Sequence, residues 1–181
     1  QRSHRLPAAG FADQAERLRG KDVETHPVHR AHRPVHRAEL DGKVADGKDA
    51  TATARAIYDH VLEKMKYDKP QGQPWGRGDA EWACDNGYGN CTDFHSYFMA
   101  IARKKGIPMR FEMGFNVPAG TETEAPVAGY HCWAFFWDGA KWVPVDASDA
   151  DKDPTRADYL FGTLDMNRVA FTGGRDLQLT P

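Results

Sequence analysis

An Asp-Gly pair between two strand-like runs constrains the fold of this 181-residue chain more than any other feature. Residues 130–137 and 141–146 are rich in aromatic and β-branched side chains, and Asp138-Gly139 between them is typical of a hairpin turn. A turn centred on this pair places His131 opposite Asp146. Directly opposed residues project from the same face of a sheet, with Cβ atoms about 5 Å apart. The pattern therefore predicts an imidazole beside a carboxylate.

The length of the turn decides whether this register holds. Pro144 has no N–H to donate, so its expected pair with Trp133 should be a non-hydrogen-bonded one. A four-residue loop over 137–140 meets that condition and a two-residue loop does not, although both keep His131 opposite Asp146. A three-residue loop would break the pairing.

A cysteine stands at the start of a predicted helix upstream of the hairpin. Asn90, Cys91 or Thr92 can begin this helix, Gly106 and Pro108 end it, and its apolar stripe comprises Phe94, Tyr97, Phe98, Ile101 and Ala102. Unpaired N–H groups at a helix N-terminus stabilise a thiolate and can also receive an oxyanion. The alternative is that Cys91 is a small buried hydrophobe, as most free cysteines are.

The cysteine and the His-Asp pair together predict a triad for thiol acyl transfer. In this interpretation Cys91 is the nucleophile, His131 accepts and donates the proton, and Asp146 orients the imidazole. A lone strand histidine is more often a satisfied core residue. Three converging features favour catalysis here.

Helical and strand-like patterns are segregated along the chain. One amphipathic helix is expected from Ala54 to Met65, with Thr51 or Thr53 as its cap, and Asp79 should cap a short helix through Trp82. Strands are expected at 109–115, 130–137 and 141–146, with weaker signals at 168–171 and 177–179. Helices followed by strands indicate an α+β domain with an antiparallel sheet.

Residues 1–49 differ in composition from residues 50–181. The first fifty residues hold no Trp, Tyr, Ile or Met, and five of the eight histidines lie in the first forty. We interpret 1–49 as a polar, His- and Arg-rich leader that is partly disordered or the remnant of an upstream region. Residues 50–181 are interpreted as the catalytic domain. For residues 26–36 the alternative is a metal-binding tract, but its spacing is irregular and no cysteine is near.

Composition excludes several classes of protein. The net charge of −2 excludes a strongly basic nucleic-acid footprint, and no apolar run reaches the roughly 18 residues of a transmembrane helix. Three cysteines cannot all pair within one chain, so a disulfide framework is disfavoured. We therefore expect a soluble protein. Its compartment stays open, with the cell envelope or secretion as options if a signal precedes this segment.

Two residue patterns are similar to metal sites, but their details disfavour both. A zinc site would draw on Cys84, Cys91, His95, His131 and Cys132. These residues contain no Cys-x-x-Cys, and Cys132 should point to the strand face opposite His131. The acidic run 149–153 begins like a calcium loop but continues with Pro154 in place of glycine and Leu160 in place of glutamate. We expect neither a metal nor another cofactor.

Three segments resemble the core motifs of bacterial transglutaminase-like proteins. They are Gly89-Asn90-Cys91-Thr92-Asp93-Phe94, Tyr130-His131-Cys132-Trp133-Ala134 and Trp142-Val143-Pro144-Val145-Asp146-Ala147-Ser148, and residues 75–79 and 167–176 are also similar. The resemblance covers residues 50–181 and implies a papain-like core with the Cys91, His131 and Asp146 roles given above. Phe135 departs from the pattern because relatives often carry Glu there, so a polar contact near the site is expected to be missing.

The resemblance constrains the chemistry more than the substrate, since the family includes protein-crosslinking transamidases, peptidases and deglycosylating amidases. It implies attack on amide bonds of a protein or peptide substrate through a thioester. The short chain without calcium loop or accessory domains favours hydrolysis. Transamidation of glutamine to amines is the alternative, and an inactive peptide-binding module is the alternative of another class. Trp75, Asn90 and Trp133 are the candidates for the substrate cleft, with Trp75 also a candidate for oxyanion support. The oligomeric state stays open.

Overall fold

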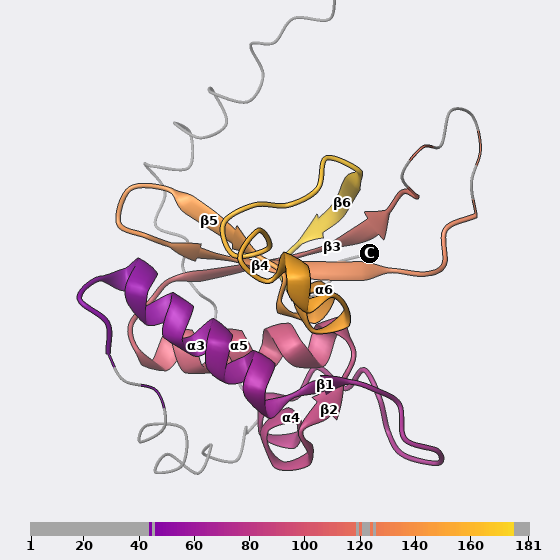
Figure 1. Ribbon diagram of the computed structural model, residues 1–181, viewed down its shortest axis with the longest axis horizontal. Helices are drawn as coiled ribbons and strands as arrows, with labels where there is room; N and C mark the ends of the chain where they lie inside the picture. The colour runs from indigo at the N-terminus through magenta and orange to yellow at the C-terminus, as the bar shows by residue number, and fades with distance from the viewer. Residues whose placement is uncertain (1–43, 45, 119, 121–123, 125, 176–181) are drawn as a thin grey trace, which may run out of the picture. The chain divides into compact units, whose positions relative to one another are not determined.

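The structure is a computed structural model that describes Val44 and residues 46–118, 120, 124 and 126–175. Its helices are α3 (Ala50–Lys64), α4 (Ala80–Asn86), α5 (Cys91–Lys104) and α6 (Ala147–Lys152), with a 3-10 turn η1 (Pro154–Arg156). Strands β1 (Lys66–Tyr67) and β2 (Tyr88–Gly89) form a short parallel pair. Strands β3 (Met109–Asn116), β4 (His131–Trp137), β5 (Trp142–Val145) and β6 (Arg168–Gly173) form an antiparallel sheet in the order β5-β4-β3-β6 (Figure 1). The predicted α+β class with an antiparallel sheet is confirmed.

Local sequence signals explain where the helices begin and end. The side chain of Asp49 caps α3 by accepting from the Ala52 N–H, so the expected cap at Thr51 or Thr53 was wrong. Asp79 caps α4 as predicted, and this helix runs on to Asn86 before Gly87 ends it with φ 69°. Within the described part of the chain, no helix is both long and apolar enough to span a bilayer.

Several expectations lie outside the described residues. They concern the strand at 177–179, the tract at 26–36 and most of the segment 1–49. The weaker strand signal at 168–171 lies within the described part and corresponds to β6.

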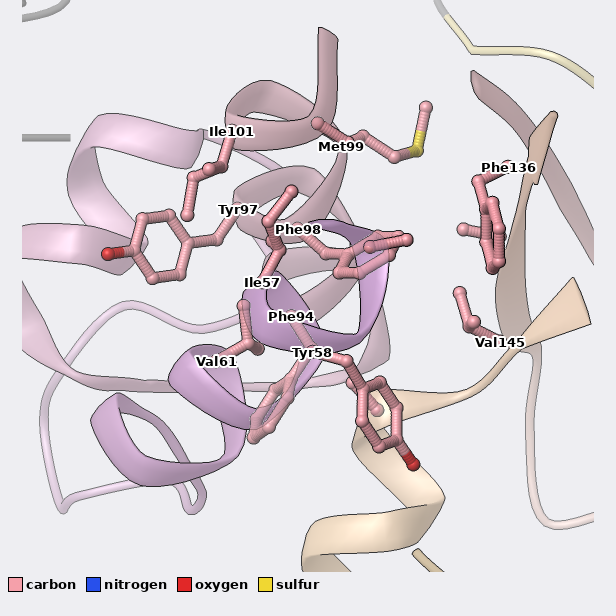
Figure 2. Packing of buried hydrophobic residues seen from close by; sticks show 14 of the residues in the cluster. Ile57, Tyr58, Val61, Phe94, Tyr97, Phe98, Met99, Ile101, Phe136 and Val145 are labelled. Carbon is pink, nitrogen blue, oxygen red and sulfur yellow. The ribbon is translucent and has the colours of Figure 1, made fainter. Parts of the chain in front are cut away.

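The hydrophobic core lies between the helices and one face of the sheet (Figure 1). Figure 2 shows Ile57 and Val61 of α3 near Phe94 of α5, while Phe136 and Val145 of the sheet lie on the other side of α5. Each large apolar side chain that is fully buried stabilises the fold by about 1.5–3 kcal/mol. The expected apolar stripe on α5 is buried, and it packs this helix against α3 and against the sheet.

The first turns of α5 are buried on polar faces as well as on the apolar stripe. Thr92, Asp93, His95 and Ser96 are all buried, and His95 and Asp93 are fully so. A polar group removed from water destabilises the fold unless it gains a hydrogen-bond partner. Each of these side chains therefore has to be bonded within the protein, which makes the start of α5 a rigid polar centre.

The β4–β5 hairpin differs in register from the predicted one. Phe135 lies opposite Pro144 and Trp137 opposite Trp142, so the pairing is shifted by two residues from the expected match of Trp133 with Pro144. The Asp138 carboxylate accepts from the N–H groups of Ala140 and Lys141 and fixes a turn centred further along the chain. Because side chains alternate with a period of two, the shift leaves every residue on its expected face.

Candidate active site

Cys91 is the first residue of α5, and its position is fixed by a capping box. The Asn90 side chain accepts from the N–H groups of Thr92 and Asp93, and the Asp93 carboxylate accepts in return from the Asn90 N–H at 3.0 Å. A Cβ at Gly89 would lie 2.5 Å from this carboxylate, so only glycine fits before the cap. The helix start therefore holds the Cys91 thiol at the positive end of the helix dipole.

Asp93 also anchors the segment that contains Trp75. Its two carboxylate oxygens accept from the N–H groups of Gly76 and Gly78, each at 2.8 Å. Gly76 has φ 68°, and a Cβ there would lie 2.6 Å from the Asn90 side-chain nitrogen. The loop is thus tied to the same cap that positions the cysteine.

Cys91 is 2% exposed, and its thiol hydrogen-bonds with two side chains, those of Cys132 and His131. A hydrogen bond with the Cys132 thiol lowers the pKa of Cys91 most, burial opposes this, and a hydrogen bond with His131 and its charge lower the pKa further, to about 4. Burial and the neighbouring Cys91 raise the pKa of Cys132 well above its ordinary value. Cys91 is therefore a thiolate at neutral pH, while Cys132 stays protonated.

His131 begins β4 and forms a short hydrogen bond with Asp146. Its Nε2 lies 2.6 Å from Asp146 Oδ2 and 3.4 Å from Asp149 Oδ2. Burial alone would lower the pKa of His131, but the hydrogen bonds to Asp146 and Cys91 outweigh it and raise this pKa to about 9. With Nε2 bonded to the carboxylate, Nδ1 is the ring nitrogen left for the thiol. Between these two pKa values the pair is a thiolate and an imidazolium.

Asp146 follows β5 and is completely buried. Its Oδ1 accepts from the Ser148 hydroxyl and from the Asp149 N–H, both at 2.9 Å, and so caps α6. Its Oδ2 accepts from His131 and from the guanidinium of Arg168. Burial alone would raise the pKa of Asp146, but its hydrogen bond to His131 and the charges of His131 and Arg168 lower it instead.

Arg168 lies against the two carboxylates of a possible cation site. His131, Asp146 and Asp149 have ligand atoms within 4.8 Å of one another, which among the described residues is a possible cation site. The guanidinium of Arg168 donates to both carboxylates and its side chain is only 3% exposed. A fixed cation already balances these carboxylates, so the donor set does not fit a metal.

The cleft candidates lie at different depths. Asn90 is 8% exposed and donates from its side chain to the Tyr130 hydroxyl at 2.9 Å, in addition to capping α5. Trp133 is 2% exposed, donates to Glu112 Oε2 at 3.0 Å and lies beneath the guanidinium of Arg168. Trp75 is half-buried, packs edge-on against Tyr67, and its Nε1 has no partner among the described residues. Trp75 is thus the candidate with a buried N–H that has no partner among the described residues.

Five residues of the site were missed from the sequence. They are Arg168 and Asp149 around Asp146, His95 next to Cys91, Tyr130, whose hydroxyl bonds both Asn90 and Thr92, and Cys132, which was expected on the strand face opposite His131 but whose thiol bonds Cys91. His95 could have been found, because it lies four residues after Cys91 and therefore one helical turn away on the same face. Arg168 lies in the segment 167–176 that resembles the family, but no local pattern joins it to Asp146, since it reaches the site from the other edge strand of the sheet.

Cys91 is expected to react with iodoacetamide at a rate that is independent of pH between about 5 and 8. Its thiolate is lost only as the pH falls through about 4, and the imidazolium beside it is lost as the pH rises through about 9. An ordinary thiol loses about tenfold in rate per pH unit below about 8.5. Mass-spectrometric mapping of the labelled cysteine measures this. Equal labelling of Cys84, Cys91 and Cys132 at pH 6 would contradict it.

The chain has recognisable relatives. A family model described as the transglutaminase-like superfamily matches residues 38–147. An uncharacterized protein from Haemophilus influenzae is 36% identical over 138 residues, with 59% of this chain and 37% of that protein covered. A candidate cysteine protease of known structure from Cytophaga hutchinsonii has 20% identity and a TM-score of 0.48, over 68% of this chain and 36% of that one. The chain thus spans little more than a third of the length of either protein. From the family match, which includes the Cys91 motif, the β4 motif and Asp146, we conclude that the chain belongs to the transglutaminase-like superfamily.

Proposed function

We propose that this protein is a thiol-dependent acyl-transfer enzyme that cleaves amide bonds of proteins or peptides through a thioester on Cys91. Family membership supports a thiol-dependent enzyme in general. The observation that carries the specific proposal is the buried chain of contacts from Cys91 through His131 to Asp146 at the N-terminus of α5. A helix end, a thiol and an oriented imidazole are the parts that nucleophilic acyl transfer requires.

Each residue has one role in the proposed reaction. The Cys91 thiolate attacks the amide carbonyl carbon, and a tetrahedral oxyanion forms. The imidazolium of His131 gives its proton to the leaving amine as the C–N bond breaks, which leaves a thioester and a neutral imidazole. His131 then takes a proton from the attacking water, and the thioester breaks to a carboxylic acid and the Cys91 thiolate. Asp146 keeps the ring oriented and stabilises the imidazolium throughout.

Two N–H groups are proposed as donors to the oxyanion. The Asn90 side chain takes the N–H groups of Thr92 and Asp93, so the Cys91 N–H is not among those that the cap uses. The second donor is Nε1 of Trp75, whose lack of a partner within the described residues supports this role. In this proposal the buried N–H, which has no partner among the described residues, gains one when the oxyanion forms.

A Trp75→Phe variant is expected to lower kcat by about 10²-fold with little change in KM, because it removes one oxyanion donor and keeps an aromatic side chain. Steady-state kinetics on a cleaved peptide measures this split. A Trp82→Phe variant is the matched control, since Trp82 packs against Tyr88 and Arg77. A Trp75→Phe effect confined to KM would assign the residue to substrate binding and not to the oxyanion.

Water is proposed as the acceptor that resolves the thioester, with glutamine transamidation as the second candidate. Water needs no binding site of its own, whereas an amine acceptor needs one together with exclusion of water. The proposal is tested by offering glutamine-bearing and ordinary peptides with and without a primary amine, followed by mass spectrometry. Cleavage that depends on both Cys91 and His131 supports hydrolysis. Amine incorporation at glutamine that outpaces hydrolysis would make transamidation the main reaction.

A further inference from the structure

His95 is a fully buried imidazole that the proposed reaction does not use. Its Nδ1 lies 2.7 Å from the backbone carbonyl oxygen of Cys91. Its Nε2 lies 3.3 Å from the backbone N–H of Ala147, the residue that follows Asp146. One side chain therefore contacts the main chain beside the nucleophile and the main chain beside the orienting carboxylate.

These two contacts define the state of the ring. A carbonyl oxygen can only accept, so Nδ1 must carry a proton. The Ala147 N–H can only donate, so Nε2 must be without one. The ring that satisfies both is the neutral Nδ1–H tautomer. Complete burial favours the neutral form and lowers the pKa of His95, against the nearby carboxylate of Asp146 at 3.6 Å. The other titratable groups that act on it are Cys91 and His131, and Cys132 Sγ lies 3.7 Å from its Nδ1.

We propose that His95 is a positioning residue: a neutral Nδ1–H imidazole that ties the first turn of α5, with Cys91, to the first residue of α6, next to Asp146. The proposal rests on the proposed function, since it concerns the alignment of that same triad. Cys91 and Asp146 lie on separate elements that meet through side chains, with His131 as one link and His95 as the second. A displacement of about 1 Å between reacting groups can lower a rate about 10²-fold, so a second link is functionally significant.

Two substitutions each keep one of the two hydrogen bonds of His95 and remove the other. In His95→Asn the amide nitrogen lies near the position of Nδ1 and can still donate to the Cys91 carbonyl, but it does not reach Ala147. In His95→Gln the amide oxygen lies near the position of Nε2 and can still accept from the Ala147 N–H. The matched control is His60→Gln, because His60 also contacts α5, through the Tyr97 hydroxyl at 3.0 Å. Tyr97 lies about 9 Å further along the helix axis than Cys91.

The readout is the pH profile of Cys91 alkylation by iodoacetamide, in variants shown to be folded by circular dichroism. We expect the midpoint of the alkylation profile to rise by at least about one pH unit in both His95 variants, which lowers the rate about fivefold at pH 4, and His60→Gln to match the parent. Profiles of both folded His95 variants within twofold of the parent would overturn the proposal. A parent protein with an ordinary thiol profile would instead overturn the proposed function.

A measurement on the parent protein covers the case in which the variants do not fold. Nitrogen-15 NMR of the histidine rings reports directly which nitrogen carries the proton. The expected result for His95 is a protonated Nδ1 and an unprotonated Nε2 from pH 5 to 8. An Nε2–H tautomer or an imidazolium in that range would overturn the proposal, because neither can accept from Ala147.

Discussion

A Cys91→Ala variant is expected to fold like the parent chain and to lose amide cleavage by a factor of about 10⁴ or more. Removing the nucleophile of a triad leaves only the catalysis due to binding and oxyanion stabilisation. The change deletes one sulfur atom from a side chain that is already small and buried, so the expected loss of stability is about 1 kcal/mol. Initial rates on a cleaved peptide, with circular dichroism on the same samples, measure both effects.

The control for this substitution is Cys84→Ala. Cys84 is half-buried, and its thiol contacts the Tyr97 hydroxyl at 3.5 Å, on the part of α5 that leads away from Cys91. Its loss should leave the rate within about twofold of the parent. If activity survives in Cys91→Ala, the chain is better described as a peptide-binding module, and the thioester mechanism is wrong.

An Asp146→Ala variant is expected to lower both stability and activity. The substitution leaves the guanidinium of Arg168, which is 3% exposed, with one carboxylate partner fewer, and it leaves His131 without its acceptor at 2.6 Å. Breaking a buried ion pair from one side destabilises a protein by about 3 kcal/mol or more. The imidazole also loses its fixed orientation, for which a rate loss of about 10⁴ is expected. Urea unfolding and steady-state kinetics measure the two quantities.

Two further variants test whether the loss of stability comes from the buried charge network around Asp146. Asp158→Ala removes an ion pair of Arg55 in which the aspartate is 87% exposed, and it should change stability by less than about 1 kcal/mol. The double variant Asp146→Ala/Arg168→Met also removes the buried guanidinium that has lost one of its carboxylate partners, and it should regain part of the lost stability, but none of the activity. Equal destabilisation by Asp146→Ala and Asp158→Ala would contradict the buried network.

Residues close in sequence allowed much of the fold to be predicted. The Cys91 helix, the strand that begins at His131 and the strand that precedes Asp146 all follow from local apolar patterns and turn residues. The register of the hairpin could not be predicted, because it depends on which N–H groups the Asp138 side chain accepts from. The error of two residues left His131 and Asp146 on one face, so the expected contact is present although the expected pairing is not.

The contacts that surround the triad depend on distant parts of the chain. Arg168 reaches Asp146 from β6, which is separated from β4 by β3, and this contact requires the strand order of the finished sheet. Asp149 joins the cluster because α6 begins directly after Asp146, whereas in the sequence its acidic run only began like a calcium loop. His95 lies within helical reach of Cys91, but its bond to Ala147 requires α5 and α6 to be packed.

The central claim is that Cys91 carries the acyl group during the reaction. An activated ester, such as a p-nitrophenyl ester of a short acyl group, acylates a reactive thiolate without requiring the natural substrate. We expect protein that has reacted at pH 6 and is then quenched with acid to gain the mass of one acyl group. Peptide mapping should locate this group on Cys91, and the Cys91→Ala variant should not gain it. Acyl groups spread over lysines or over the other two cysteines, with none enriched on Cys91, would contradict the thioester mechanism.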